Sequence, residues 1–179
     1  MNIWAGGLSG SSIGLLKIRP SDGTILLTVT IQPTINGLAY DGQNIWATQY
    51  YTNKVVKVRA SDGEVRGTFD VGPFPWGAAF DGANIWIANV GDGSLTKLRA
   101  NDGALVGTFP IAGSELIFDG KHLWAPDCLN SSVSRVRPTN GRIEGRFRVG
   151  NCPQGILFDG ASVWTADFYS RRVDKLTGP

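Results

Sequence analysis

The residues of this chain that could do chemistry are a few carboxylates, two cysteines and a single histidine, His122. With one histidine, none of the serines has the basic partner that an activated nucleophile needs. The sequence also has no Gly-x-Ser-x-Gly, no His-Glu-x-x-His and no phosphate-binding loop motif. The remaining chemistry is that of carboxylates: Glu115, Asp127 and Asp167 could supply the oxygen ligands that Ca²⁺ and Mg²⁺ prefer, if the fold brings them together.

Composition and charge narrow the functional classes. The chain has 179 residues, with 17 basic and 15 acidic side chains and a formal net charge of +2. This near-neutral balance argues against nucleic-acid binding and against a polybasic membrane-binding module. No run of about 18 apolar residues is present, and the first residues lack the features of an export signal, so we expect neither a membrane span nor a signal peptide. The 24 glycines and 6 tryptophans indicate many turns and little helix.

An internal repeat dominates the sequence. An aromatic residue followed by Asp-Gly, two further residues, an aliphatic residue and Trp recurs at 40–46, 80–86, 118–124 and 158–164. Together with Trp4, the periodic tryptophans are separated by 38 to 42 residues. A period of about 40 residues without a helical pattern predicts a β-propeller rather than a helical solenoid.

Each repeat predicts one four-stranded antiparallel blade. In one repeat, the small apolar residues 77–80 predict an inner strand that ends in a tight Asp-Gly turn, and three further strands follow at 84–89, 94–99 and 104–109. Such a sheet cannot bury both faces alone, so blades must stack around an axis. The expected fold is all-β, a propeller of about 4.5 blades, five with two of them incomplete. The blade boundaries fall at 1–36, 37–76, 77–114, 115–154 and 155–179.

The strand count leaves the closure of the ring open. The first and last blades have three strands each, so an inner and an outer strand are missing. The ring could stay open by one segment, two chains could complete each other's sheets, or the chain could be a piece of a longer propeller. Because unpaired strand edges promote aggregation, the last two alternatives are favoured.

The repeat resembles the bacterial propeller repeats of the YVTN and NHL type, including streptogramin-lyase-like proteins. The shared pattern is Pro-x-Gly before the inner strand, Phe-Asp-Gly-x-Asn-Ile-Trp across the first turn, and Thr-Lys-Leu-Arg-Ala-x-Asp-Gly along the third strand, and it covers essentially the whole chain. The resemblance implies that the loops before the inner strands and after the second strands share one face, which usually holds the site. It implies no single function, because propellers host lyases, lactonases, oxidoreductases and pure binding proteins.

Several positions on that implied loop face vary where the scaffold repeats. We expect a ligand-binding surface there, formed by residues that precede the inner strands or end the second strands: Asn36, Trp76, Gln154, Gln49 and Asn89. Trp76 is the one tryptophan outside the periodic register, and it could offer a platform for a sugar ring or another flat ligand, or else plug the channel. An aromatic rim could be extended by Tyr50, Tyr51, Phe168 and Tyr169.

Glu115 occupies a position where three other blades have glycine. With Asp127 and Asp167, at the ends of second strands, it could form a Ca²⁺ or Mg²⁺ site on the loop face. Alternatively, Glu115 points to solvent and each aspartate caps the turn that follows it. Streptogramin-lyase-like relatives use histidines and a glutamate around Mg²⁺, whereas His122 aligns with a turn asparagine on the opposite face, so the resemblance does not extend to their catalytic residues.

The two cysteines fall in loops of the same face, one blade apart. Cys128 and Cys152 could form a disulfide, which would favour an extracytoplasmic location, or they could remain free thiols.

Basic residues recur along every third strand, at Lys17, Lys57, Lys97, Arg135 and Lys175. Because they repeat with the scaffold, we expect them to solvate the outer strands and to form local ion pairs rather than a nucleic-acid site.

These features favour a non-catalytic propeller that binds a small molecule, a glycan or a protein on its loop face. One alternative is a divalent-metal-assisted enzyme of lyase or lactonase type on the same face. Another is a piece of a larger propeller that assembles with copies of itself through its open blade edges.

Overall fold

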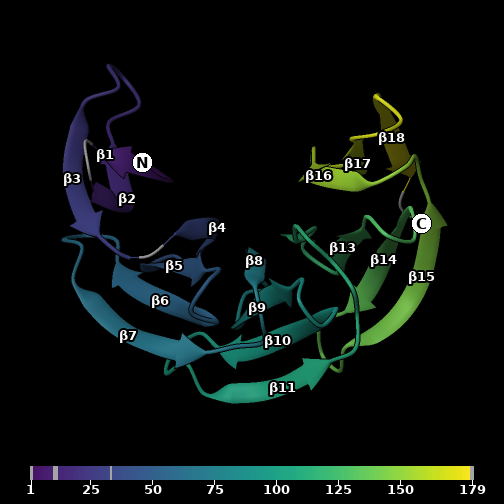
Figure 1. Cartoon of the computed structure of the whole chain (residues 1–179), viewed down its shortest axis with the longest axis horizontal. Helices are drawn as coiled ribbons and strands as arrows, with labels where there is room; N and C mark the ends of the chain where they lie inside the picture. Colours follow the sequence, from purple (N-terminus) through teal and green to yellow (C-terminus); the bar gives the residue numbers. More distant parts are fainter. Residues whose placement is uncertain (1, 10–11, 33, 178–179) are drawn as a thin grey trace.

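Five antiparallel sheets follow one another along a crescent (Figure 1). This architecture comes from a computed structural model that describes residues 2–9, 12–32 and 34–177. The crescent is open between the sheet of β1, β2 and β3 and the sheet of β16, β17 and β18. The first strand of each sheet lies toward the inside of the crescent, and β7, β11 and β15 follow its outer rim.

The strands are short and similar in length. The first sheet contains β1 (Ile3–Ser9), β2 (Ser12–Ile18) and β3 (Ile25–Thr30). The second contains β4 (Ile35–Tyr40), β5 (Asn44–Gln49), β6 (Lys54–Arg59) and β7 (Val65–Asp70), and the third β8 (Pro75–Phe80), β9 (Asn84–Asn89), β10 (Ser94–Arg99) and β11 (Leu105–Phe109). The fourth contains β12 (Ile117–Phe118), β13 (Leu123–Asp127), β14 (Ser132–Arg137) and β15 (Arg142–Arg148), and the last β16 (Pro153–Phe158), β17 (Ser162–Asp167) and β18 (Arg172–Thr177).

The predicted all-β propeller architecture is confirmed by these 18 strands among the described residues, in sheets of three, four, four, four and three. One inner strand is shorter than predicted: β12 begins at Ile117 rather than at Glu115. The loop before it is two residues shorter than the others and lacks their proline, so residues 112–116 follow an irregular path. Within the described part of the chain, no helix is long and apolar enough to cross a membrane.

The hydrophobic core lies between the blades rather than inside any one of them. One cluster joins Trp46 and Val55 of the second blade to Ile85, Ile87 and Leu98 of the third. Trp46, Trp86 and Trp124 are at most 1% exposed, and each ring packs 5.1–5.3 Å from a phenylalanine of the outer strand of its own blade. Each blade therefore depends on its neighbour for burial, as the alternation of apolar residues along the strands predicts.

The Asp-Gly turn anchors each buried tryptophan. In the third blade, Oδ1 of Asp81 accepts the backbone N–H groups of Ala83 and Asn84 at 2.9 and 2.7 Å, and Oδ2 accepts the indole N–H of Trp86 at 2.8 Å. The following Gly82 has a φ of +96°, a conformation that favours glycine. The same indole-to-carboxylate bond recurs in the other complete blades and in the last one, at 2.7–2.8 Å.

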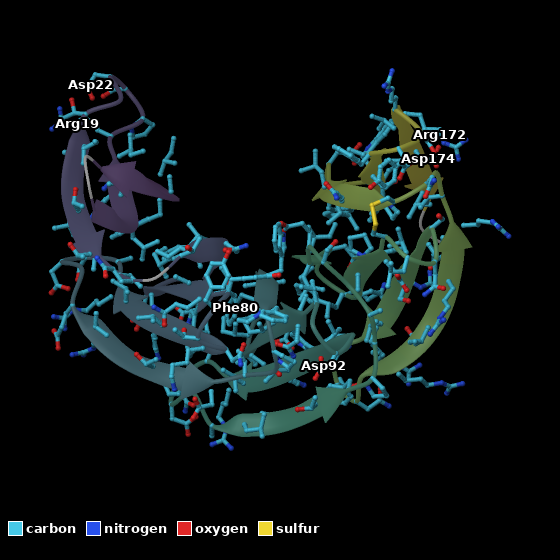
Figure 2. The ribbon with its side chains drawn as sticks, in the orientation of Figure 1. Arg19, Asp22, Phe80, Asp92, Arg172 and Asp174 are labelled. Carbon is cyan, nitrogen blue, oxygen red and sulfur yellow. A yellow bond between two sulfur atoms is a disulfide. The ribbon has the colours of Figure 1, made fainter. Side chains whose placement is uncertain are left out.

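The periodic lysines join neighbouring blades, so the expectation that they are solvated is wrong for the central ones. Lys57 and Lys97 are 8% and 5% exposed, and each ammonium lies 5.0 Å from the centre of a tryptophan ring on the neighbouring strand. The Nζ atoms donate to backbone carbonyls of the next blade, from Lys57 to Ala100 at 2.7 Å and from Lys97 to Pro138 at 2.6 Å. Local ion pairing is confirmed for arginines that stand two residues after these lysines, as in Arg19–Asp22 at 2.9 Å (Figure 2).

Glycines allow the inner strands to approach closely near the axis. The backbone N–H of Gly77 donates to the carbonyl of Ser114 in the next blade at 2.9 Å. A Cβ on Gly77 would lie 2.7 Å from Cα of Glu115 and closer still to that carbonyl oxygen. The repeated glycine thus fixes the spacing of the blades at the centre.

Candidate functional site

Trp76 and Glu115 meet at the inner edge of the third and fourth blades. The indole Nε1 of Trp76 donates to Oε1 of Glu115 at 3.1 Å. Thr48 fixes the backbone on the other side, since its hydroxyl donates to the carbonyl of Trp76 at 2.7 Å. Trp76 remains 39% exposed, so one side of the held ring is open to solvent.

Two further aromatic side chains, Tyr50 and Phe74, lie beside this pair. The ring of Tyr50 stacks on Phe74 at 5.0 Å and meets Trp76 edge-on at 5.8 Å. Phe74 has a φ of +53°, an uncommon backbone conformation for a bulky residue, and is 43% exposed. We call Tyr50, Phe74, Trp76 and Glu115 the aromatic–carboxylate ledge. An exposed aromatic surface with one carboxylate can hold a flat apolar ligand face and accept hydrogen bonds from its polar edge.

Burial raises the pKa of the Glu115 carboxyl, and the hydrogen bond from the Trp76 indole partly opposes this effect. When a carboxyl has a higher pKa in the folded than in the unfolded protein, the protein loses stability as the pH rises through the folded-state pKa. At neutral pH the charged carboxylate of Glu115 therefore lowers the stability of the folded protein, as is common where a carboxylate takes part in ligand binding.

We expect Glu115→Gln to raise the melting temperature at pH 7 to 8. The amide oxygen can still accept the indole N–H, while the cost of burying a charge disappears. Below the ordinary pKa of 4.5 the wild-type carboxyl is protonated in both states, so the two proteins should then melt alike. Melting curves from pH 4 to 8 check this; a variant that is less stable at pH 8 would contradict it.

Two of the predicted ligand-binding residues are buried and support loops instead. Nε2 of Gln49 donates to the carbonyl of Gln32 at 2.5 Å, in the loop that leads into β4. Asn89 is fully buried, and its Nδ2 donates to the hydroxyls of Ser94 and Thr96 at 3.0 and 2.8 Å. Both side chains are therefore unavailable to a ligand on the surface, because they tie strand ends to neighbouring chain segments.

The other two predicted ligand-binding residues differ in their surroundings. Asn36, in β4, is half-buried, and its Oδ1 is buried without a hydrogen-bond partner among the described residues. Gln154, in β16, is exposed and lines a cavity at the last blade together with Asp167 and Phe168. The predicted aromatic rim forms two separate pairs, Tyr50 with Tyr51 at 5.0 Å and Phe168 with Tyr169 at 5.1 Å.

The three carboxylates predicted as metal ligands have separate partners. Asp127 accepts the backbone N–H and the side-chain amide of Asn130, and so caps its turn. Asp167 accepts the backbone N–H of Gly150 at 3.0 Å; burial and the nearby Asp174 raise its pKa. Glu115 instead binds Trp76. Within residues 2–9, 12–32 and 34–177, no three His, Cys, Asp or Glu side chains form a group that could hold a metal ion, and a metal site on this face stays a prediction.

The structure contains the disulfide between Cys128 and Cys152. It joins the turn after β13 to the loop before β16, so it links the fourth blade to the fifth (Figure 2). Of the two alternatives for these cysteines, the structure therefore has the bonded one, which is compatible with an oxidising compartment.

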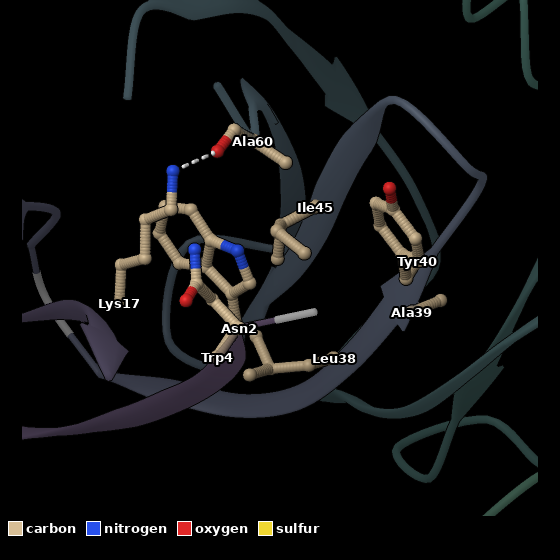
Figure 3. Close-up of a pocket in the computed structure, with 8 residues that line it drawn as sticks. All are labelled: Asn2, Trp4, Lys17, Leu38, Ala39, Tyr40, Ile45 and Ala60. Carbon is tan, nitrogen blue, oxygen red and sulfur yellow. Dashed lines mark hydrogen bonds between the residues drawn. The ribbon is translucent and has the colours of Figure 1, made fainter. Parts of the chain in front are cut away.

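A second cavity lies between the first two blades (Figure 3). It has a volume of about 380 Å³ and is lined by Trp4, Lys17, Leu38, Tyr40 and Ile45, among others. In later blades, the inner strand and its Asp-Gly turn cover the corresponding tryptophan, as Ala39 and Asp41 do for Trp46. The cavity therefore lies where an inner strand would complete the first sheet.

Comparison with known proteins places the fold. No family model matches the chain, and no curated protein does. Among solved structures, virginiamycin B lyase from Staphylococcus aureus superposes with a TM-score of 0.79 at 19% sequence identity, over 99% of this chain and 63% of that one. A candidate 6-phosphogluconolactonase from Bacteroides uniformis has a TM-score of 0.77 at 16% identity, over 99% and 64%. A streptogramin B lyase has 0.76 at 17%, over 99% and 65%.

The chain thus spans a little under two thirds of the length of these structures, and at this identity the likeness concerns the fold. The antiparallel four-stranded sheets, the cores between them and these superpositions agree. The chain is a β-propeller repeat protein.

Proposed function

We propose that this propeller is a non-catalytic binding protein whose aromatic–carboxylate ledge holds a glycan or another small molecule with a flat apolar face. The observation that carries the proposal is the exposed Trp76 ring, held in place by Glu115 and flanked by Tyr50. Sugar rings and similar ligands stack on such a ring through their apolar face.

The carboxylate of Glu115 can also take part in recognition. Its Oε1 accepts the indole N–H, while Oε2 has no hydrogen-bond partner among the described residues. A hydroxyl at the edge of a stacked ring could donate to Oε2 in this half-buried position, where a hydrogen bond to a charged group contributes more than in water.

The test is saturation-transfer NMR with a panel of soluble gluco-, galacto- and chito-oligosaccharides. We expect at least one to bind the wild-type protein, and Trp76→Ala to weaken that binding by about tenfold or more, because the stacking surface is lost. Phe168→Ala is the matched control, since Phe168 is an exposed aromatic residue on another blade. Equal binding by wild type and Trp76→Ala, or no binding by any member of the panel, would overturn the proposal.

A metal-assisted enzyme of lyase or lactonase type is the second candidate. The names of the structural neighbours support it, since two are lyases and one is a candidate lactonase. Among the residues named for it, Glu115 is half-buried beside the exposed Trp76 ring, whereas Asp127 and Asp167 are buried. Under this proposal Ca²⁺ or Mg²⁺ raises the melting temperature by mass action, and Glu115→Gln abolishes the rise. No specific rise would leave binding alone as the function.

Association with copies of the same chain stays a prediction. The cavity beside Trp4 supports it, because β1 is an edge strand of its sheet and an inner strand of the repeat, supplied by another chain, would pair with it there. Light scattering tests this: a discrete oligomer is expected, and a monomer at all concentrations would contradict it.

A further inference from the structure

The fourth blade departs from the repeat in its turns on the side opposite the ledge. Lys121 stands where the other blades have Gln43, Ala83 and Ala161. Arg142 stands where they have Thr24, Glu64 and Ala104, and Asn140 replaces an aspartate that recurs at 22, 62 and 102. His122, the single histidine, replaces an asparagine or a serine. The changes at Lys121, Asn140 and Arg142 each make this blade more positive than the others.

These changes surround one cavity. It has a volume of about 540 Å³ and is lined by the side chains of Lys121, His122, Arg135, Arg137, Arg142 and Glu144, with Ile143. The volume lies within the range of small-molecule sites. The lining comes from the turn before β13 and from β14 and β15, so the blade itself holds it in place.

The charges in this cavity do not cancel. Glu144 is paired with Arg137, whose Nε donates to Oε1 at 2.7 Å, and it also lies 3.3 Å from Nε2 of His122. The Nδ1 atom of His122 lies 3.5 Å from Asp119, whose Oδ2 already accepts the Trp124 indole N–H. Three cations in the lining, Lys121, Arg135 and Arg142, have no carboxylate partner among the described residues.

The sister blades use the same positions differently. There the arginine that corresponds to Arg137 pairs with the turn aspartate three residues later, as in Arg99–Asp102 at 3.0 Å. With Asn140 in that place, Arg137 turns to Glu144 instead. Arg135 lies over the rings of Trp124 and Phe147, at 5.9 and 5.6 Å, which orients its planar guanidinium beside the cavity.

We propose that this cavity binds a small ligand through an oxyanion, a phosphate or sulfate group. Arginine offers planar, paired N–H donors that match such oxygens, and lysine adds a point charge. The proposal is independent of the ledge, which lies at the other end of the blade strands, and it adds a second binding site of opposite charge preference.

The single histidine makes the test direct, because His122 lines this cavity and its imidazole proton signals need no assignment among other histidines. We expect inorganic phosphate to shift these NMR signals saturably at fixed pH and ionic strength, relative to chloride. Titrations with sulfate and with glycerol 3-phosphate separate the sources: tighter binding of the ester indicates a phosphorylated organic ligand, and equal binding of all three indicates a general oxyanion site. Equal, unsaturated shifts with chloride and phosphate would overturn the proposal.

Variants that restore the residues of sister blades test the lining. Lys121→Ala and Arg142→Thr should each weaken phosphate binding by about tenfold, the factor that corresponds to about 1.4 kcal/mol. Arg148→Ala is the matched control, because Arg148 is exposed on β15 but lies outside the cavity lining. If Arg148→Ala weakens binding as much as Arg142→Thr, general surface charge accounts for the effect and the proposed site is wrong.

Discussion

Gly77→Ala should strongly destabilise this propeller, with an expected loss of about 3 kcal/mol or more in the free energy of unfolding. A Cβ at this position would lie 2.7 Å from Cα of Glu115, and the obstructing atoms are backbone, which cannot rotate away. The third and fourth blades would have to move apart near the axis, which would also break the bond from Gly77 N–H to the Ser114 carbonyl. Denaturant titration followed by tryptophan fluorescence measures the loss.

Gly155→Ala is the matched control for this prediction. Gly155 holds the same position in the repeat, but a Cβ there meets only Cβ of Ala166, at an ordinary contact distance of 3.4 Å. Alanine also restricts the unfolded chain, so this variant should be neutral or slightly stabilising, by up to about 1 kcal/mol. Equal losses for the two variants would show that the blades are not held together by close backbone contact at Gly77.

Asp81→Ala is expected to cost about 3–5 kcal/mol, because four donors lose their acceptor at once. The carboxylate of Asp81 accepts two backbone N–H groups of its turn, the side-chain amide of Asn84 and the indole N–H of the fully buried Trp86. Each buried donor left without a partner costs about 1–3 kcal/mol. The loss should appear as a lower midpoint of denaturation, with exposure of Trp86 in the same transition.

Two further substitutions serve as comparisons for Asp81→Ala. Asp102→Ala removes an aspartate of the exposed turn between β10 and β11, where it pairs with Arg99 at 3.0 Å, and should cost about 1 kcal/mol or less. Asp81→Asn keeps an acceptor oxygen and should fall between the two. If Asp81→Ala were as mild as Asp102→Ala, the Asp-Gly turn would not anchor the tryptophan.

The two proposed sites differ in how far the sequence could predict them. Trp76 and Glu115 depart from the repeat, and this departure distinguishes them in the sequence alone. The cavity at Lys121 and Arg142 carries the same kind of signal, but charged residues at exposed turns are common, and their convergence depends on side-chain positions. Tyr50 joins the ledge because Phe74 and Trp76 bring it into contact from the next blade.

Local sequence determined the architecture of this protein. Strand periodicity, Asp-Gly turns and the spacing of the tryptophans act over a few residues and recur in each blade, so they predicted 18 strands and an all-β propeller. The tertiary structure decided which polar residues are accessible. Gln49, Asn89, Asp127 and Asp167 end equivalent strands and looked like one lining, yet each satisfies donors or acceptors of a nearby segment. A buried polar group must find a partner, and packing between blades, rather than position in the repeat, supplies that partner.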